Sequence, residues 1–202
     1  MKPASFFLLF ALAFTSCTVP GSLHPLTKNA TEVYYNPALA GQWVSDDSSA
    51  ETYIITPGDD PAEKYYRCAV ISTENDNKDT ANFILRFVKL NGLNYLDCWF
   101  DLKSFGKNFK DLVYYNVPRH FFYKINIINN DAVELHFPDI DAIRELVKNG
   151  KIDLQIADLQ SLDISEDYLV ISETPELQKA FIEFEKYAPT IYKDKLTFTR
   201  VH

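Results

Sequence analysis

The amino-acid sequence predicts a mainly β protein, folded as an antiparallel β-barrel of about eight to ten strands with two short amphipathic helices. From Leu39 onward apolar residues alternate with polar residues, which is the period of a strand with one buried face. Turn signals such as Asn91-Gly92 separate neighbouring runs, so consecutive strands are expected to form hairpins. A meander of this length leaves two exposed edges unless it closes, and closure into a barrel removes them.

Composition places the chain among globular proteins and bounds its partners. The 202 residues are 47% hydrophobic and 24% charged, which suits one domain with a sizeable core. The formal net charge is -8, and no basic cluster is present. Nucleic-acid binding needs grouped Lys and Arg side chains that release counterions from phosphates, so a nucleic-acid partner is not expected.

The first residues have the pattern of a secretory signal peptide. Within residues 1–16, Lys2 precedes an apolar run from Phe6 to Phe14, about half of the roughly 20 residues that a membrane-spanning helix needs. The following Phe14-Thr15-Ser16-Cys17 resembles the lipobox of bacterial lipoproteins, whose cysteine is diacylated, for example with palmitate, and becomes the new N-terminus. The resemblance implies a lipid-anchored protein of the bacterial envelope, at its outer membrane. Plain secretion, with cleavage after Ala13, is the alternative.

The segment after Cys17 is expected to be a flexible tether. It contains Pro20, Gly21 and Pro25 and shows no apolar period, so we assign residues 17–32 to the tether and residues 33–202 to a single barrel domain. Loss of Lys2 with the signal peptide leaves 19 basic against 28 acidic residues, a net charge of -9. Membrane lipid is therefore expected as a partner through the acyl chains on Cys17, and not through charge.

The expected strands follow one another with short polar connections, and they cover residues 41–45, 52–56, 64–72, 81–90, 93–101, 121–128, 132–137, 152–156, 168–172 and 195–201. A two-residue turn at Asn91-Gly92 places Phe83 opposite Phe100 on the inner face, and Arg86 opposite Asp97 as an ion pair on the outer face. A three-residue loop over residues 129–131 pairs Ile125 with Leu135 in the second hairpin.

Two helices are expected to act as lids or plugs of the barrel. Residues 139–149 carry a stripe of apolar side chains and end at Gly150, which suits the C-terminal cap position. The second helix starts with Thr174 as N-cap and Pro175 in the first turn, and it runs to Tyr187.

Gly41-Gln42-Trp43 at the start of the first barrel strand and Arg200 near the end of the last resemble the lipocalin signature. The resemblance implies that Trp43 closes one end of the barrel and that Arg200 lies over its ring as a cation-π pair. Stretches over residues 117–121, 135–152 and 174–181 are together similar to bacterial lipocalin-like lipoproteins without an assigned activity. That family implies a fold and an envelope location but no reaction.

No motif for catalysis, for a cofactor or for a metal is recognised. His120 is the one histidine worth following, although a structural role is favoured for it. Cys68 and Cys98 are expected to be unpaired, because a strand between them separates them by about 9.6 Å, beyond the reach of a disulfide.

The candidate functional region is therefore the barrel interior. The side chains expected to line a ligand cavity are Tyr66, Phe83, Leu85, Phe87, Phe100, Tyr123 and Ile125. A barrel of eight strands can hold a small ligand or be filled by its own side chains. Two hypotheses follow. The barrel binds a small apolar or amphipathic molecule, or it has a solid core and contacts an envelope protein through its surface, including Tyr114 and Tyr115.

Overall fold

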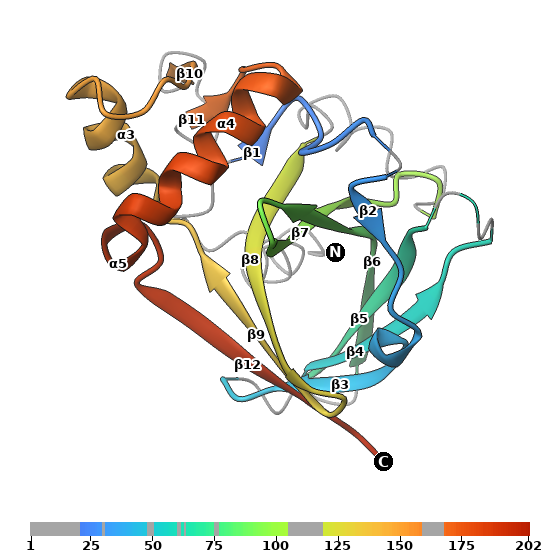
Figure 1. Ribbon diagram of the computed structural model, residues 1–202. Coiled ribbons are helices and arrows are strands. Elements are labelled where there is room, and N and C mark those ends of the chain that lie inside the picture. The colour runs from blue at the N-terminus through green and yellow to red at the C-terminus, as the bar shows by residue number, and fades with distance from the viewer. Residues whose placement is uncertain are drawn as a thin grey trace, which may run out of the picture.

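A computed structural model of the chain describes residues 21–29, 31–47, 51–59, 62, 64–74, 77–104, 119–158 and 168–202. Within these ranges it forms a closed antiparallel barrel of eight strands, seen in Figure 1 as a ring of arrows. Those strands are β3 (Gly41–Ser45), β4 (Glu51–Pro57), β5 (Tyr66–Glu74), β6 (Asn77–Leu90), β7 (Leu93–Phe100), β8 (His120–Asn129), β9 (Ala132–Phe137) and β12 (Asp194–Arg200).

Each barrel strand pairs with the next in sequence, and β12 closes the ring by pairing with both β9 and β3. The predicted register of the first hairpin is confirmed, because β6 and β7 pair Phe83 with Phe100 and Arg86 with Asp97. Its turn has positive φ at Asn91 (49°) and Gly92 (83°), as a two-residue hairpin requires.

The second hairpin keeps the predicted pairs, including Ile125 with Leu135, but reaches them differently. Asn129 pairs with Ala132 across a two-residue turn, and an irregularity between Ile127 and Asn129 shifts the register by one residue. The expected three-residue loop is thus a two-residue turn combined with a β-bulge.

From Gly21 to Thr27 the expected tether is docked against the barrel. Strand β1 (Gly21–Ser22) pairs with the first residues of β8 and, in parallel, with β11 (Tyr168–Val170). Leu26 is fully buried. The prediction of a flexible segment over residues 17–32 is therefore wrong for residues 21–27, because Ser22, Leu26 and Thr27 lose their solvent exposure on folding.

Two further short strands complete the sheet. Strand β2 (Val33–Tyr34) pairs with β6 beyond the point where β5 begins, and β10 (Ile156–Asp158) pairs with β11. The strand expected over residues 152–156 is thus displaced toward the C-terminus. Ile152 and Leu154 are buried in the side-chain cluster beneath the helices and belong to no ladder.

The helices are α3 (Ile140–Lys148) and α4 (Thr174–Phe184), followed by the short turns η4 (Glu185–Tyr187) and α5 (Ala188–Ile191). They lie against the outside of the wall and neither cap nor plug the barrel, which corrects that expectation (Figure 1). The ring of Phe181 on α4 packs edge-on against Tyr95 of β7 and Phe122 of β8, with centroids 5.4 and 5.3 Å apart.

Thr174 does not cap its helix, since its hydroxyl donates to the carbonyl of Pro25.

The molecule consequently has two hydrophobic cores separated by the barrel wall. The inner core fills the barrel and contains Trp43, Phe83 and Tyr123. The outer core lies between the wall and the helices and contains Tyr95, Phe122, Phe181 and Leu26. Alternate residues of β7 and β8 contribute to opposite cores, as expected for strands covered on both faces.

Candidate functional site

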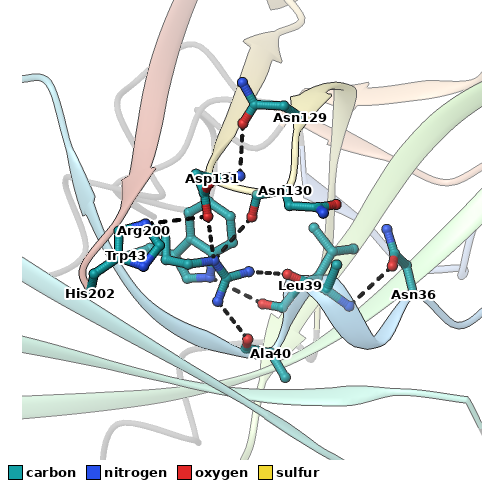
Figure 2. Close-up of polar contacts among 10 residues, drawn as sticks. Asn36, Leu39, Ala40, Trp43, Asn129, Asn130, Asp131, Arg200 and His202 are labelled. Carbon is teal, nitrogen blue, oxygen red and sulfur yellow. Dashed lines mark hydrogen bonds and ion pairs between the residues drawn. The ribbon is translucent and has the colours of Figure 1, made fainter.

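One end of the barrel is sealed by Trp43 and Arg200. Trp43 is 2% exposed, and the guanidinium carbon of Arg200 lies 4.4 Å from the centroid of its ring. The two residues face each other across the β12–β3 pair that closes the ring. The predicted cation-π contact is therefore confirmed, and it lies where the first and last barrel strands meet (Figure 2).

The chain that precedes β3 completes this seal. Arg200 donates to the carbonyl oxygens of Ala38 and Ala40, the latter at 2.8 Å, and its Nε donates to Asn130 at 3.0 Å (Figure 2). Ala38 belongs to the 3-10 turn η1 (Pro37–Leu39), and Ala40 is the residue after it. The indole of Trp43 donates to the carbonyl of Leu39, 3.0 Å away.

Gly41 is required by the same geometry. Its φ is +145°, a conformation that side chains with a Cβ rarely adopt, and a Cβ there would collide with Nη1 of Arg200. Gly41, Trp43 and Arg200 thus form one structural unit, in which the glycine allows the guanidinium to approach the backbone.

Above the seal lies a small apolar cavity of about 40 Å³. A buried water needs roughly 10–15 Å³ measured in this way, whereas binding sites for small molecules usually have about 300–1,000 Å³. The residues that line the cavity are Leu39, Trp43, Tyr53, Ile55, Cys68, Leu85, Phe87, Leu96, Ile125, Val133, Leu135 and Phe198. Three of the seven predicted lining residues, Leu85, Phe87 and Ile125, are among them.

Aromatic rings fill the rest of the interior. On β6, β7, β8 and β9, large inward residues lie farther from the seal, and they include Phe83, Phe100, Phe121, Tyr123 and Phe137. The rings of Phe83 and Phe100 have centroids 4.7 Å apart, and those of Tyr123 and Phe137 are 5.2 Å apart. Tyr66, at the sealed end, is fully buried and exchanges hydrogen bonds with the backbone of Asn36. The remaining predicted lining residues therefore fill the barrel and do not line its cavity.

Cys68 and Cys98 are both free and buried, which confirms the prediction that they are unpaired. Burial raises the pKa of the Cys68 thiol to about 12 and also raises that of Cys98. Because the thiolate is the reactive form, neither side chain is suited to act as a nucleophile.

His120, which is half-buried, pairs with the buried Asp97 on the outer side of the wall. The two side chains are 2.7 Å apart, Asp97 is fully buried, and its second oxygen accepts a hydrogen bond from the backbone of Leu26 at 3.0 Å. The predicted ion pair between Arg86 and Asp97 is absent from the described residues. The guanidinium of Arg86 instead lies 5.3 Å from the ring centroid of Trp99.

Sequence reasoning missed the importance of Asp97, because an outward position on a barrel strand normally faces solvent. The sequence does hold a signal for this burial. Tyr95 on β7 and Phe122 on β8 are apolar residues at outward positions, and they indicate a wall that is covered on both faces. The favoured structural role of His120 agrees with this pair.

Other chemical possibilities find little support in the described part of the chain. No group of three or more His, Cys, Asp or Glu side chains there is arranged to hold a metal ion. No helix in those ranges has the length and apolarity needed to cross a membrane. Cys17, Tyr114 and Tyr115 lie outside the described residues.

Comparison with protein-family models, with curated proteins and with solved structures finds no match for this chain. The similarity to lipocalins and to lipocalin-like lipoproteins therefore stays a prediction, carried by the Gly41, Trp43 and Arg200 arrangement and by the closed eight-stranded ring.

Proposed function

We propose that this protein is a lipid-anchored protein of the bacterial envelope, held at Cys17, whose lipocalin-like barrel is a rigid scaffold that contacts another envelope protein. The observation that carries the scaffold role is the filled interior. A cavity of about 40 Å³ is several times smaller than the roughly 300 Å³ at which small-molecule sites begin.

The kinship with lipocalins is supported by the sealed end. The contact between Trp43 and Arg200 joins the first and last strands of the ring, and Gly41 makes room for it. A resemblance in fold does not determine function, so the interior has to be considered separately.

Binding of a small apolar ligand is the second candidate, favoured by the apolar lining of the cavity. Leu85, Phe87 and Ile125 all face it, and no charged residue lines it. An engineered protein cavity that holds benzene measures about 150 Å³, so a ligand of that size requires these side chains to move.

Native mass spectrometry and thermal unfolding with added benzene distinguish the two candidates. The scaffold proposal expects the wild-type protein to carry no bound molecule and to show no stabilisation by benzene. The matched Phe87→Ala variant enlarges the cavity and should gain stabilisation by benzene, which shows that the assay detects binding. If the same molecule were released from several independent wild-type preparations, the scaffold proposal would be wrong and the protein would be a ligand carrier.

The anchor is tested by Cys17→Ala, with Thr18→Ala as the matched control. The control should fractionate with membranes and yield an N-terminal peptide with the mass of an acylated cysteine. The alanine variant should lose both properties. An unmodified cysteine in the membrane-associated wild-type protein would contradict lipid anchoring.

The partner is tested by photo-crosslinking in cells. Photoreactive residues replace three exposed apolar side chains, Tyr35, Ile128 and Ile182. At least one position should give a crosslinked species of one defined mass, which disappears when the partner identified from it is deleted. Only diffuse or absent products from all three positions would contradict a specific partner.

A further inference from the structure

The docked N-terminal segment restricts how the molecule can lie on a membrane. Strand β1 pairs Gly21 with Phe121 and Ser22 with His120, at the beginning of β8. The other end of β8, at Asn129, adjoins the loop that supplies Asn130 to Arg200. Eight residue steps separate Phe121 from Asn129, about 26 Å along an extended strand. Strand β1 therefore lies at the end of the barrel opposite the seal (Figure 1).

Cys17 is only four residues before Gly21. A fully extended chain covers at most about 3.6 Å per residue, so Cys17 is within roughly 14 Å of β1 in any conformation. This distance is shorter than the barrel. If Cys17 is acylated and inserted in the bilayer, β1 must stay close to the membrane surface. The sealed end of the barrel then cannot face the bilayer as long as β1 remains paired with β8.

The surface around β1 has apolar side chains that can meet lipid. Leu23 is 36% exposed and Ile171 is 37% exposed. Ser22 pairs with Val170 in the parallel register of β1 and β11. Leu23 and Ile171 directly follow this pair and are therefore neighbours. Polar side chains near them contact one another, because Glu173 lies 3.4 Å from His24 and 3.3 Å from Lys28.

We propose that the end of the barrel carrying β1 and β11 rests on the bilayer, with Leu23 and Ile171 at the lipid surface and the Trp43–Arg200 seal pointing away. The inference rests on acylation of Cys17. It does not depend on anionic lipid, since the mature chain has a net charge of -9 and lacks electrostatic attraction to such a surface.

The test uses the acylated full-length protein in phosphatidylcholine vesicles that contain lipid with a nitroxide headgroup. A fluorophore is attached in turn to Leu23→Cys, Ile171→Cys and the control Val201→Cys, which is similarly exposed at 42% but adjoins the seal. Cys68 and Cys98 are buried and should remain unlabelled. Emission from positions 23 and 171 should be quenched several times more strongly than emission from position 201.

A second variant carries a flexible Gly-Ser insert of about 20 residues between Val19 and Pro20, which lengthens the tether by tens of ångströms. It should lower the quenching at position 171 to the level at position 201. Equal quenching at all three positions, or quenching at position 23 without position 171, would overturn the proposed orientation. The mass of the N-terminal peptide is measured in the same samples, so that missing acylation is recognised as a failure of the anchor.

Discussion

The inner and outer cores are close neighbours but are built by different rules. The inner core is almost entirely apolar, and its side chains come from one face of eight strands whose register is set by the ring. The outer core joins separate segments to the wall, and each is located by a polar contact. Lys124 on β8 pairs with Glu185 at 2.6 Å, Asp97 accepts from Leu26, and Thr174 donates to Pro25.

This difference reflects what specifies each arrangement. Backbone ladders fix the positions of strands, so apolar packing is sufficient inside the barrel. A helix or an extended segment can slide on an apolar surface, and buried polar pairs can select one position. Stability should therefore depend mainly on packing volume in the inner core and on individual polar groups in the outer core.

The largest effect is expected at Trp43. Trp43→Ala removes a nearly fully buried ring and the platform for Arg200, and it should lower the free energy of unfolding by about 4 kcal/mol. Urea denaturation measures the change. The matched variant is Trp99→Ala, which removes the ring beside Arg86 on the outer face and should cost about half as much because that ring is partly exposed. Equal losses would contradict the distinction between the two faces.

Asp97 tests the role of polar contacts in the outer core. Asp97→Asn removes the charge that pairs with His120 and weakens the bond from Leu26, and it should lower the free energy of unfolding by about 3 kcal/mol. Asp131→Asn is the control, since its carboxylate is 53% exposed and pairs with Arg200 at the surface. That change should cost less than about 1 kcal/mol. A silent Asp97 variant in urea unfolding would refute this role.

Leu26 tests whether the N-terminal segment belongs to the domain. Leu26→Ala empties a fully buried position and should cost about 2 kcal/mol, and hydrogen exchange at Ser22 and Leu26 should accelerate. Leu23→Ala on the same segment is exposed and should change the free energy of unfolding by less than about 0.5 kcal/mol. Identical behaviour of the two variants would restore the expectation of a free tether.

The smallest effect is expected from thiol reagents at pH 8. Burial raises the pKa of Cys68 to about 12, so very little of its thiol is ionised at pH 8, and Cys68 and Cys98 are both shielded by the inner core. In the native protein Cys68 and Cys98 should react only at the rate of global unfolding, and both should react fully after denaturation. The Asp97→Asn variant weakens the outer core. If the outer core opens before the inner core, Cys68 and Cys98 of this variant should still be protected from the reagent in mild denaturant. Rapid reaction in native protein would show that the inner core opens independently.

The inner core was predictable because local patterns determine it. Asn91-Gly92 sets a register in which Phe83 meets Phe100, and the alternation of the same strands assigns their inner faces. The contact between Trp43 and Arg200 was accessible through a resemblance, although the two residues lie far apart in sequence.

The outer core was not predictable in the same way, because it depends on long-range docking. Asp97 has the same outward parity as an exposed residue, and only the segment around Leu26 and the helix containing Phe181 bury that side of the wall. The segment from Gly21 to Thr27 has no periodic pattern, since it docks through short pairings with β8 and β11 and through the buried Leu26. The volume of the cavity depends on the rotamers of a dozen side chains, which no pattern specifies.

Closure of the ring by β12 also affects biosynthesis. Among the eight barrel strands, β12 is the last to leave the ribosome, and it supplies partners to β3 and β9 at once. Until it arrives, both of these strands keep bare backbone edges that can recruit other chains. The newly made polypeptide is consequently vulnerable to aggregation shortly before β12 emerges, when the other seven barrel strands exist but the ring around the inner core is still open.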